Sequence, residues 1–112
     1  MATMQNFTPG HYIKEWRNHR RLSLRKLADR MESAPGEELI SAMSLSRIER
    51  GMQPYSQPIL EALAIALSTT TWALISVNPL IDSDIVDFML YLRDATQSER
   101  EKALELLKVI KA

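Results

Sequence analysis

The sequence predicts an all-α protein of about seven helices, and three observations support this fold class. Apolar residues recur at i, i+3, i+4 and i+7 along most of the chain, which is the spacing of one face of a helix. No segment alternates apolar and polar residues over more than a few positions, as a half-buried strand would. Short stretches containing Pro, Gly or Ser separate the helical segments. The 112 residues include no Cys, which excludes disulfides and thiolate metal sites.

The N-terminal third contains a leader and two predicted helices. Residues 1–9 are expected to form a flexible polar leader. A first helix is predicted over His11–Arg20, and Ser23 is a suitable N-cap for a second. The second helix has a complete apolar stripe, formed by Leu24, Leu27, Ala28 and Met31.

A loop and a third helix follow. Pro35-Gly36 predicts a loop over residues 32–38, because this dipeptide breaks a helix. A helix is expected over Ala42–Arg50, with Ser41 as its N-cap. Gly51 is placed to end that helix in a left-handed conformation.

Four further helices complete the pattern. They are predicted over Gln57–Leu67, Thr70–Val77, Asp82–Asp94 and Gln97–Lys111. Asn78-Pro79 stops the second of these, and Thr96 forms a capping box with Glu99 before the last. We therefore divide the chain into the leader, a domain at residues 10–78 and a helical extension at residues 79–112.

The charge is unevenly spread, although 14 basic and 14 acidic residues give a formal net charge of zero. Residues 1–51 hold nine basic and six acidic residues, a net of +3, whereas residues 52–112 hold five and eight, a net of −3. Residues 10–31 alone carry seven basic and two acidic residues, a net of +5. This asymmetry indicates that the N-terminal half meets a polyanion; the alternative is an ordinary solvated basic face.

Four stretches of sequence carry a resemblance to a known family. They read IKEWR at 13–17, LSLRKLA at 22–28, SLSRIERG at 44–51 and ILEALAIAL at 59–67. Over residues 11–77 the chain resembles the phage-repressor and Cro-like (XRE-type) helix-turn-helix transcriptional regulators. The resemblance implies a five-helix lambda-repressor-like DNA-binding domain, here followed by two C-terminal helices, with residues 42–50 as the recognition helix in the major groove.

The recognition helix is expected to read bases with its outward side chains, while Leu45 and Ile48 seat it in the domain. The candidate base contacts are Ala42, Met43, Ser46 and Arg47. Arg47 is the strongest candidate, because a guanidinium can bond guanine O6 and N7 together. The alternative for Arg47 is a phosphate contact or a solvated position.

A second set of residues is expected to contact phosphates. Around the start of the second helix they are Arg20, Arg21, Ser23, Arg25 and Lys26. Past the recognition helix, the resemblance adds Arg50, Tyr55 and Gln57. Such contacts position a protein on DNA without reading sequence, and each of these residues could instead be solvated.

The resemblance also implies a structural ion pair between Arg17 and Glu49, which would hold the recognition helix against the first helix. The chain departs from the family pattern in two places. Ten steps separate Met31 from the cap of the third helix, an insertion of seven, and Leu24 replaces a commonly polar residue. The acidic side chains of Glu37 and Glu38 in the insertion are expected to point away from DNA.

No constellation of residues indicates an enzyme. His11 and His19 lack a suitably spaced Asp or Cys, so both are interpreted as surface or phosphate-proximal histidines. The acids at positions 82, 84 and 87 suit the helix N-terminus better than a metal site. With three glycines and no Gly-rich loop, no phosphate-bearing cofactor is expected, and neither is a metal.

The two C-terminal helices carry more apolar surface than a five-helix core needs. We expect residues 79–112 to form a homodimer interface; the alternative is that they pack on the core of the same chain. The expected interface residues are Ile85, Val86, Phe88, Met89, Leu90, Leu92, Leu104, Leu107 and Ile110.

These observations predict a sequence-specific DNA-binding transcriptional regulator, expected to be a repressor, that binds a palindromic operator in double-stranded DNA as a homodimer. The alternatives are an antitoxin or similar module that clasps a protein partner, and a helix-turn-helix fold that has lost DNA binding. The longest apolar stretches, Ile59–Leu67 and Trp72–Val77, are far shorter than the ~20 residues of a membrane helix. The resemblance implies a cytoplasmic protein of bacterial or phage origin, associated with the nucleoid when bound.

Overall fold

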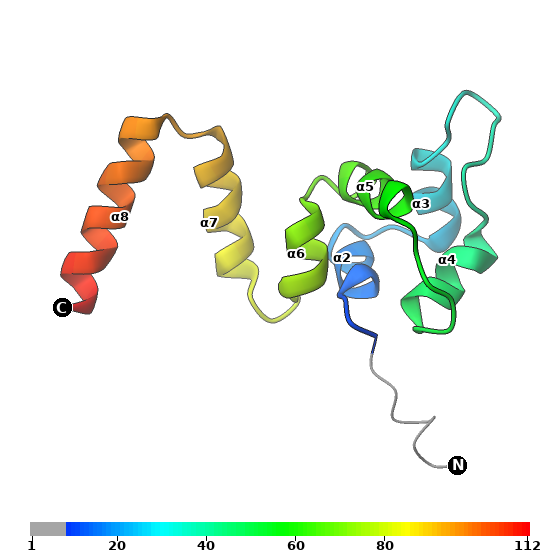
Figure 1. Ribbon diagram of the computed structural model, residues 1–112, viewed down its shortest axis with the longest axis horizontal. Coiled ribbons are helices and arrows are strands. Elements are labelled where there is room, and N and C mark those ends of the chain that lie inside the picture. The colour runs from blue at the N-terminus through cyan, green and yellow to red at the C-terminus, as the bar shows by residue number, and fades with distance from the viewer. Residues whose placement is uncertain (1–8) are drawn as a thin grey trace, which may run out of the picture. The chain divides into compact units, whose positions relative to one another are not determined.

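The computed structural model describes residues 9–112 and is all-helical over that range, which confirms the predicted fold class (Figure 1). Most of the predicted leader lies outside the described residues. The helices are α2 (Ile13–His19), α3 (Leu24–Arg30), α4 (Ala42–Glu49), α5 (Gln57–Ala66), α6 (Thr71–Ser76), α7 (Ser83–Asp94) and α8 (Gln97–Lys111). Within residues 9–112, no helix is long and apolar enough to cross a membrane.

The helix boundaries follow local capping chemistry. The hydroxyls of Ser23 and Ser41 accept hydrogen bonds from the backbone N–H three residues ahead, as predicted, and so satisfy groups that a helix leaves without a partner. The capping box of Thr96 and Glu99 is present at the start of α8. Gly51 follows α4 with φ +74°, the left-handed conformation expected of it.

The first helix is shorter than predicted, Ile13–His19 instead of His11–Arg20. Its N-terminus is displaced because Tyr12 N–H donates to the carbonyl of Leu74 at 2.6 Å, which draws the preceding backbone toward α6. At its other end, Arg21 adopts φ +59° and reverses the chain toward α3. The other predicted helices differ from the observed ones by no more than one residue at either end.

The described chain divides into two compact units, the first ending at Ile81 and the second spanning Asp82–Ala112. The first unit contains helices α2 to α6 around one apolar core. Its fully buried side chains are Ile13, Trp16, Leu27, Leu45, Ile48, Leu63, Leu67, Leu74 and Pro79. Leu45 and Ile48 belong to α4, so the two residues that the apolar spacing predicted to face the core do anchor this helix in it.

Trp16 is the largest side chain of this core and joins α2 to α6. Its indole Nε1–H donates to the carbonyls of Ala73 and Val77, both at 3.0 Å. A buried indole N–H needs such a partner, and the shared bond fixes the end of α6 against α2.

The second unit consists of α7 and α8, and its apolar residues are mostly accessible. Ile85, Phe88, Leu104, Leu107 and Ile110 are exposed, and three more of the expected interface residues, Met89, Leu90 and Leu92, are half-buried. Val86 is the exception. It is 1% exposed within the single chain, which sets it apart from the other expected interface residues.

Replacing Trp16 with Phe tests the link between α2 and α6. We expect Trp16→Phe to lower the free energy of unfolding by about 1–3 kcal/mol, because it removes the donor to two carbonyls in a buried site. Urea denaturation followed by circular dichroism measures the change. Trp72→Phe is the matched control, since this exposed indole should cost no more than about 0.5 kcal/mol. Equal effects of the two substitutions would contradict the assignment.

Candidate nucleic-acid interface

Helix α4 divides cleanly into a seated side and an outward side. Leu45, Ile48 and Glu49 are buried, whereas Met43 is 65% exposed and Arg47 is exposed. The other two candidate base contacts, Ala42 and Ser46, are half-buried. The outward side therefore combines one long basic side chain with apolar and small ones.

An ion pair between Arg17 and Glu49 holds α4 to α2. The Arg17 Nε donates to Glu49 Oε2 at 2.6 Å and Nη2 donates to Oε1 at 3.0 Å, so the pair is bidentate. The two side chains are only 13% and 4% exposed. The hydrogen bond to Glu49 raises the pKa of Arg17. The pair occupies the place that the resemblance implied for it.

The same guanidinium also secures the turn between α2 and α3. Arg17 Nη1 donates to the carbonyl of Leu22 at 2.9 Å, one residue before the Ser23 cap. One side chain therefore links α2, the start of α3 and α4. Because Glu49 is buried, these bonds compensate for the cost of removing its charge from water.

His11 has a structural position that sequence reasoning missed. It was expected at the surface or near a phosphate, but the ring is half-buried. Its Nε2 lies 3.0 Å from the carbonyl oxygen of Ile48. The ring also contacts the Tyr55 ring edge-on, with 5.7 Å between the two centroids. Nδ1 accepts from the backbone N–H of Ile13 at 3.4 Å, so Nε2 carries the proton that the carbonyl accepts. His11 thus holds the C-terminal end of α4 and the loop that follows it.

Burial lowers the pKa of His11 below its ordinary value of 6.5, and this effect outweighs the bond to Ile48 and the charges of Glu15 and Glu49, which raise it. The neutral ring matches its two bonds, one donated and one accepted. No residue spacing in the sequence predicts this arrangement, because the partners are 37 and 44 residues away along the chain.

The expected phosphate contacts fall into two groups around α4. Arg21, Ser23, Arg25 and Lys26 are exposed near the start of α3. Arg50 and Gln57 are exposed beyond the end of α4, and the half-buried Tyr55 lies against His11. All of these side chains are exposed or half-buried, although Ser23 also caps α3.

Arg20 differs from the other members of this set. Its Nε donates to the carbonyl of Leu67 at 2.7 Å, its Nη2 donates to that of Ser68 at 3.0 Å, and its guanidinium lies 5.3 Å from the centre of the Trp16 ring. Helix α5 ends there without a glycine, so these carbonyls need other donors. Arg20 therefore has a structural role at the end of α5, which the sequence did not predict.

The inserted loop between α3 and α4 forms an ordered turn. Ser33 N–H donates to the Glu37 carbonyl at 3.0 Å, and Glu37 N–H donates to the Ala34 carbonyl at 2.8 Å. Gly36 makes the reversal possible with φ +78°, and its N–H donates to the Glu32 carboxylate at 3.2 Å. Of the acidic residues of this loop, Glu32 and Glu38 line the same hollow as the start of α4.

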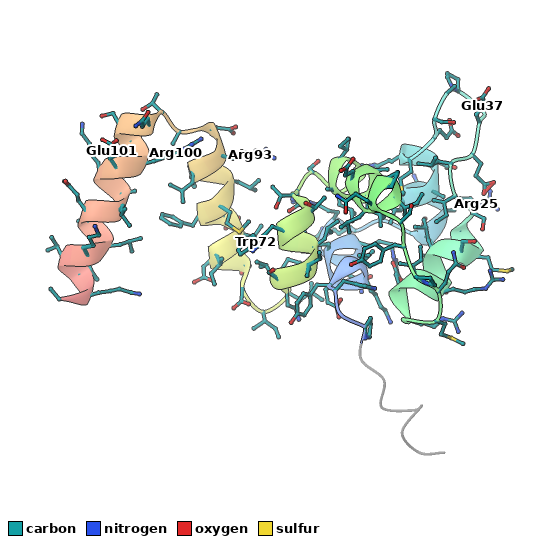
Figure 2. All side chains as sticks on the ribbon, in the orientation of Figure 1. Arg25, Glu37, Trp72, Arg93, Arg100 and Glu101 are labelled. Carbon is teal, nitrogen blue, oxygen red and sulfur yellow. The ribbon has the colours of Figure 1, made fainter. Side chains whose placement is uncertain are left out.

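A hollow of about 500 Å³ separates this loop from the two helices. Arg25 lines it from α3, Ala42 and Met43 line it from α4, and Glu38 lines it from the loop. Figure 2 shows Arg25 beside the helices and Glu37 farther out on the loop. Glu38 thus lies closer to the first turn of α4 than Glu37, and the expectation that both glutamates point away from DNA stays a prediction.

Comparison of the chain with protein-family models, curated proteins and solved structures finds no match. Among residues 9–112, no group of three or more His, Cys, Asp or Glu side chains is arranged to hold a metal ion. A function is therefore inferred from the placement of the residues around α4.

Removing Arg17 tests whether the ion pair is structural. We expect Arg17→Ala to destabilise the fold by about 3–5 kcal/mol, since it leaves the buried Glu49 charge without a partner. Arg17→Ala combined with Glu49→Leu should cost clearly less than the sum of the two single changes. Chemical denaturation measures both. Lys14→Ala, on an exposed position of the same helix, is the control; an Arg17→Ala effect as small as that of the control would contradict the role.

The lowered pKa of His11 has a consequence for pH. The folded chain protonates the His11 ring less readily than the unfolded chain does. The neutral ring therefore contributes its full amount to the free energy of unfolding above pH 6.5, and this contribution is lost as pH falls through the lower folded-state pKa. The difference in unfolding free energy between wild type and His11→Gln should be constant above pH 6.5 and change below it. A difference that stays flat down to pH 5 would rule this out.

Proposed function

We propose that this protein is a sequence-specific DNA-binding transcriptional regulator, with α4 as the recognition helix in the major groove. The observation that carries the proposal is the rigid mounting of α4. Two buried apolar residues, the Arg17–Glu49 pair and the His11 bond hold one side of the helix, while Met43 and Arg47 face outward. A helix that reads base edges needs such a fixed orientation.

The placement of basic residues also supports the proposal. Arg25 borders the same hollow as Ala42 and Met43, so its guanidinium lies beside the first turn of α4, although Glu32 and Glu38 line that hollow as well. Arg50 lies at the other end of the helix. In this proposal Arg47 reads a base, Arg25 and Arg50 bind phosphates, and helices α2 to α6 form a domain of the lambda-repressor type, as the resemblance in residues 11–77 implies.

The regulator acts as a homodimer on a palindromic operator in this proposal, and repression is its expected effect. One small domain touches few base pairs, and two copies related by a two-fold axis double that number. The acidic second unit opposes non-specific attraction to DNA, because its carboxylates repel phosphates.

A protein-binding function is the second candidate, and the exposure of Met43 favours it. An apolar side chain on the outward face of α4 suits a protein partner as well as a thymine methyl group. An antitoxin would hold its toxin through such a face. Co-purification of a stable protein partner from the source organism separates this candidate from the first.

Salt-dependent DNA binding tests the proposed function. Duplexes selected from a random-sequence library serve as the probe in a mobility-shift titration across salt concentrations. We expect log K to fall linearly with log salt by about 0.9 for each phosphate contact. Arg25→Ala should weaken binding to all sequences and reduce that slope by about one, whereas Arg47→Ala should cost about 1–3 kcal/mol and relax the preference at one base position.

Arg93→Ala is the matched control, because this exposed arginine belongs to α7 and should leave both the affinity and the salt slope close to those of wild type. Binding that does not weaken with added salt contradicts the proposal. Binding that survives Arg47→Ala and Arg25→Ala together contradicts it as well.

A further inference from the structure

Helix α8 lacks the tertiary contacts that a helix of its length needs. None of its residues is buried, although its first turn is tied to α7 by Arg100, which donates to the carbonyls of Leu92 at 2.9 Å and Arg93 at 3.2 Å. Isolated helices shorter than about 12–15 residues are marginal in water, and α8, with 15 residues, lies at that limit. Most helix stability in proteins comes from packing. The apolar side of α8 therefore requires a partner.

The apolar side of α8 is also too wide for one neighbouring helix. Its apolar positions are Ala103, Leu104, Leu106, Leu107, Val109 and Ile110. At about 100° per residue they cover about 220° of the circumference, against the ~100° stripe of a helix that packs on one surface. Leu106, Val109 and Ile110 remain 61%, 72% and 69% exposed. Such a helix is suited to contact with more than one other helix.

A groove between α7 and α8 offers a second apolar surface in the same unit. It has a volume of about 660 Å³. Its apolar lining is formed by Phe88, Leu90, Tyr91, Leu92, Ala95 and Ala103. The side chains of the two helices leave this space open between them, so the hairpin does not complete a core by itself.

The exposed apolar area matches the size of a protein interface. Phe88, Tyr91, Leu104, Leu106, Val109 and Ile110 are each between 42% and 79% exposed. Together they present on the order of 700 Å² of side chain, close to the ~800 Å² that each partner contributes to a standard interface. Patches of this size on a monomer mark interaction sites.

Charge complementarity favours a second copy of this chain as the occupant. The polar lining of the groove is acidic, with Asp87, Asp94 and Glu99. The last turns of α8 carry Lys108 and Lys111 beside the exposed apolar residues. A copy of α8 laid in the groove would bring apolar side chains to its walls and ammonium groups to its acids.

We infer that α8 of each protomer lies in the α7–α8 groove of a second copy, so that the two hairpins form a four-helix assembly. One hairpin carries both the groove and the helix that fills it, as a two-fold symmetric interface requires. Each α8 then meets its own α7 and both helices of the partner, which accounts for its wide apolar arc. This inference rests on the homodimer of the proposed function and names the surface that forms it.

Sedimentation equilibrium of the full chain tests the inference. The wild type is expected to be a dimer. Leu106→Gln with Ile110→Gln should raise the dimer dissociation constant at least about 100-fold, because each change removes an apolar side chain from the interface. The near-UV signal of the buried Trp16 shows whether the first unit of the variant is still folded.

Glu101→Gln with Glu105→Gln is the matched control. It introduces the same side chain twice on the polar side of α8, and Figure 2 shows Glu101 on the side away from α7. The control should remain a dimer. A wild-type monomer at every concentration overturns the inference and indicates packing on the first unit of the same chain. A dimer that survives Leu106→Gln with Ile110→Gln overturns it too, and directs attention to the exposed Trp72 and Ile65.

The outcomes separate this inference from DNA binding. A chain that dimerises through α8 but fails to shift any selected duplex contradicts the proposed regulator and leaves the four-helix assembly in place. A monomeric chain that shifts DNA with the expected dependence on Arg47 contradicts the assembly and leaves the recognition helix in place.

Discussion

The bidentate bond between Arg17 and Glu49 is the constraint on which the arrangement of α4 depends. It joins two helices through residues that are 32 positions apart in the sequence. The remaining guanidinium nitrogen of Arg17, Nη1, donates to the carbonyl of Leu22 in the turn before α3. An ion pair that is nearly sealed from water is strong only while both partners and their hydrogen bonds are in place. The orientation of α4, and with it the outward direction of Arg47, therefore depends on a contact made on the opposite side of the helix.

Arginine has two different functions in the basic N-terminal segment. Arg17, Arg20 and Arg30 each donate to a carbonyl or carboxylate of another element, the last to the carbonyl of Ala66 at 3.3 Å. Arg25 and Lys26 extend from the exposed start of α3. The net charge of +5 in residues 10–31 thus overstates the charge available to a polyanion. What remains is a smaller basic surface that borders the first turn of α4.

The two units contrast in how their apolar residues are used. In the first unit, Leu45, Ile48 and Trp16 are buried in one core, and the polar atoms of that core have partners. In the second unit, Val86 is buried but no residue of α8 is. The same periodic pattern of apolar residues therefore has two outcomes. Periodicity predicts which side of a helix is apolar, but it does not predict whether that side packs against the same chain or against another.

Local rules were enough to predict the helices, because capping and periodicity act over a few residues. Ser23, Ser41, Gly51 and the capping box before α8 all lie where their sequence context indicated. The pairing of Arg17 with Glu49 could be predicted only from the resemblance to a known family. The roles of His11 and Arg20 were decided by tertiary structure alone, since each depends on atoms that folding brings from distant positions. Sequence by itself determined which segments are helical and which side of each is apolar; folding decided which charged and polar side chains remain available, because burial and hydrogen bonding between remote elements leave no local pattern.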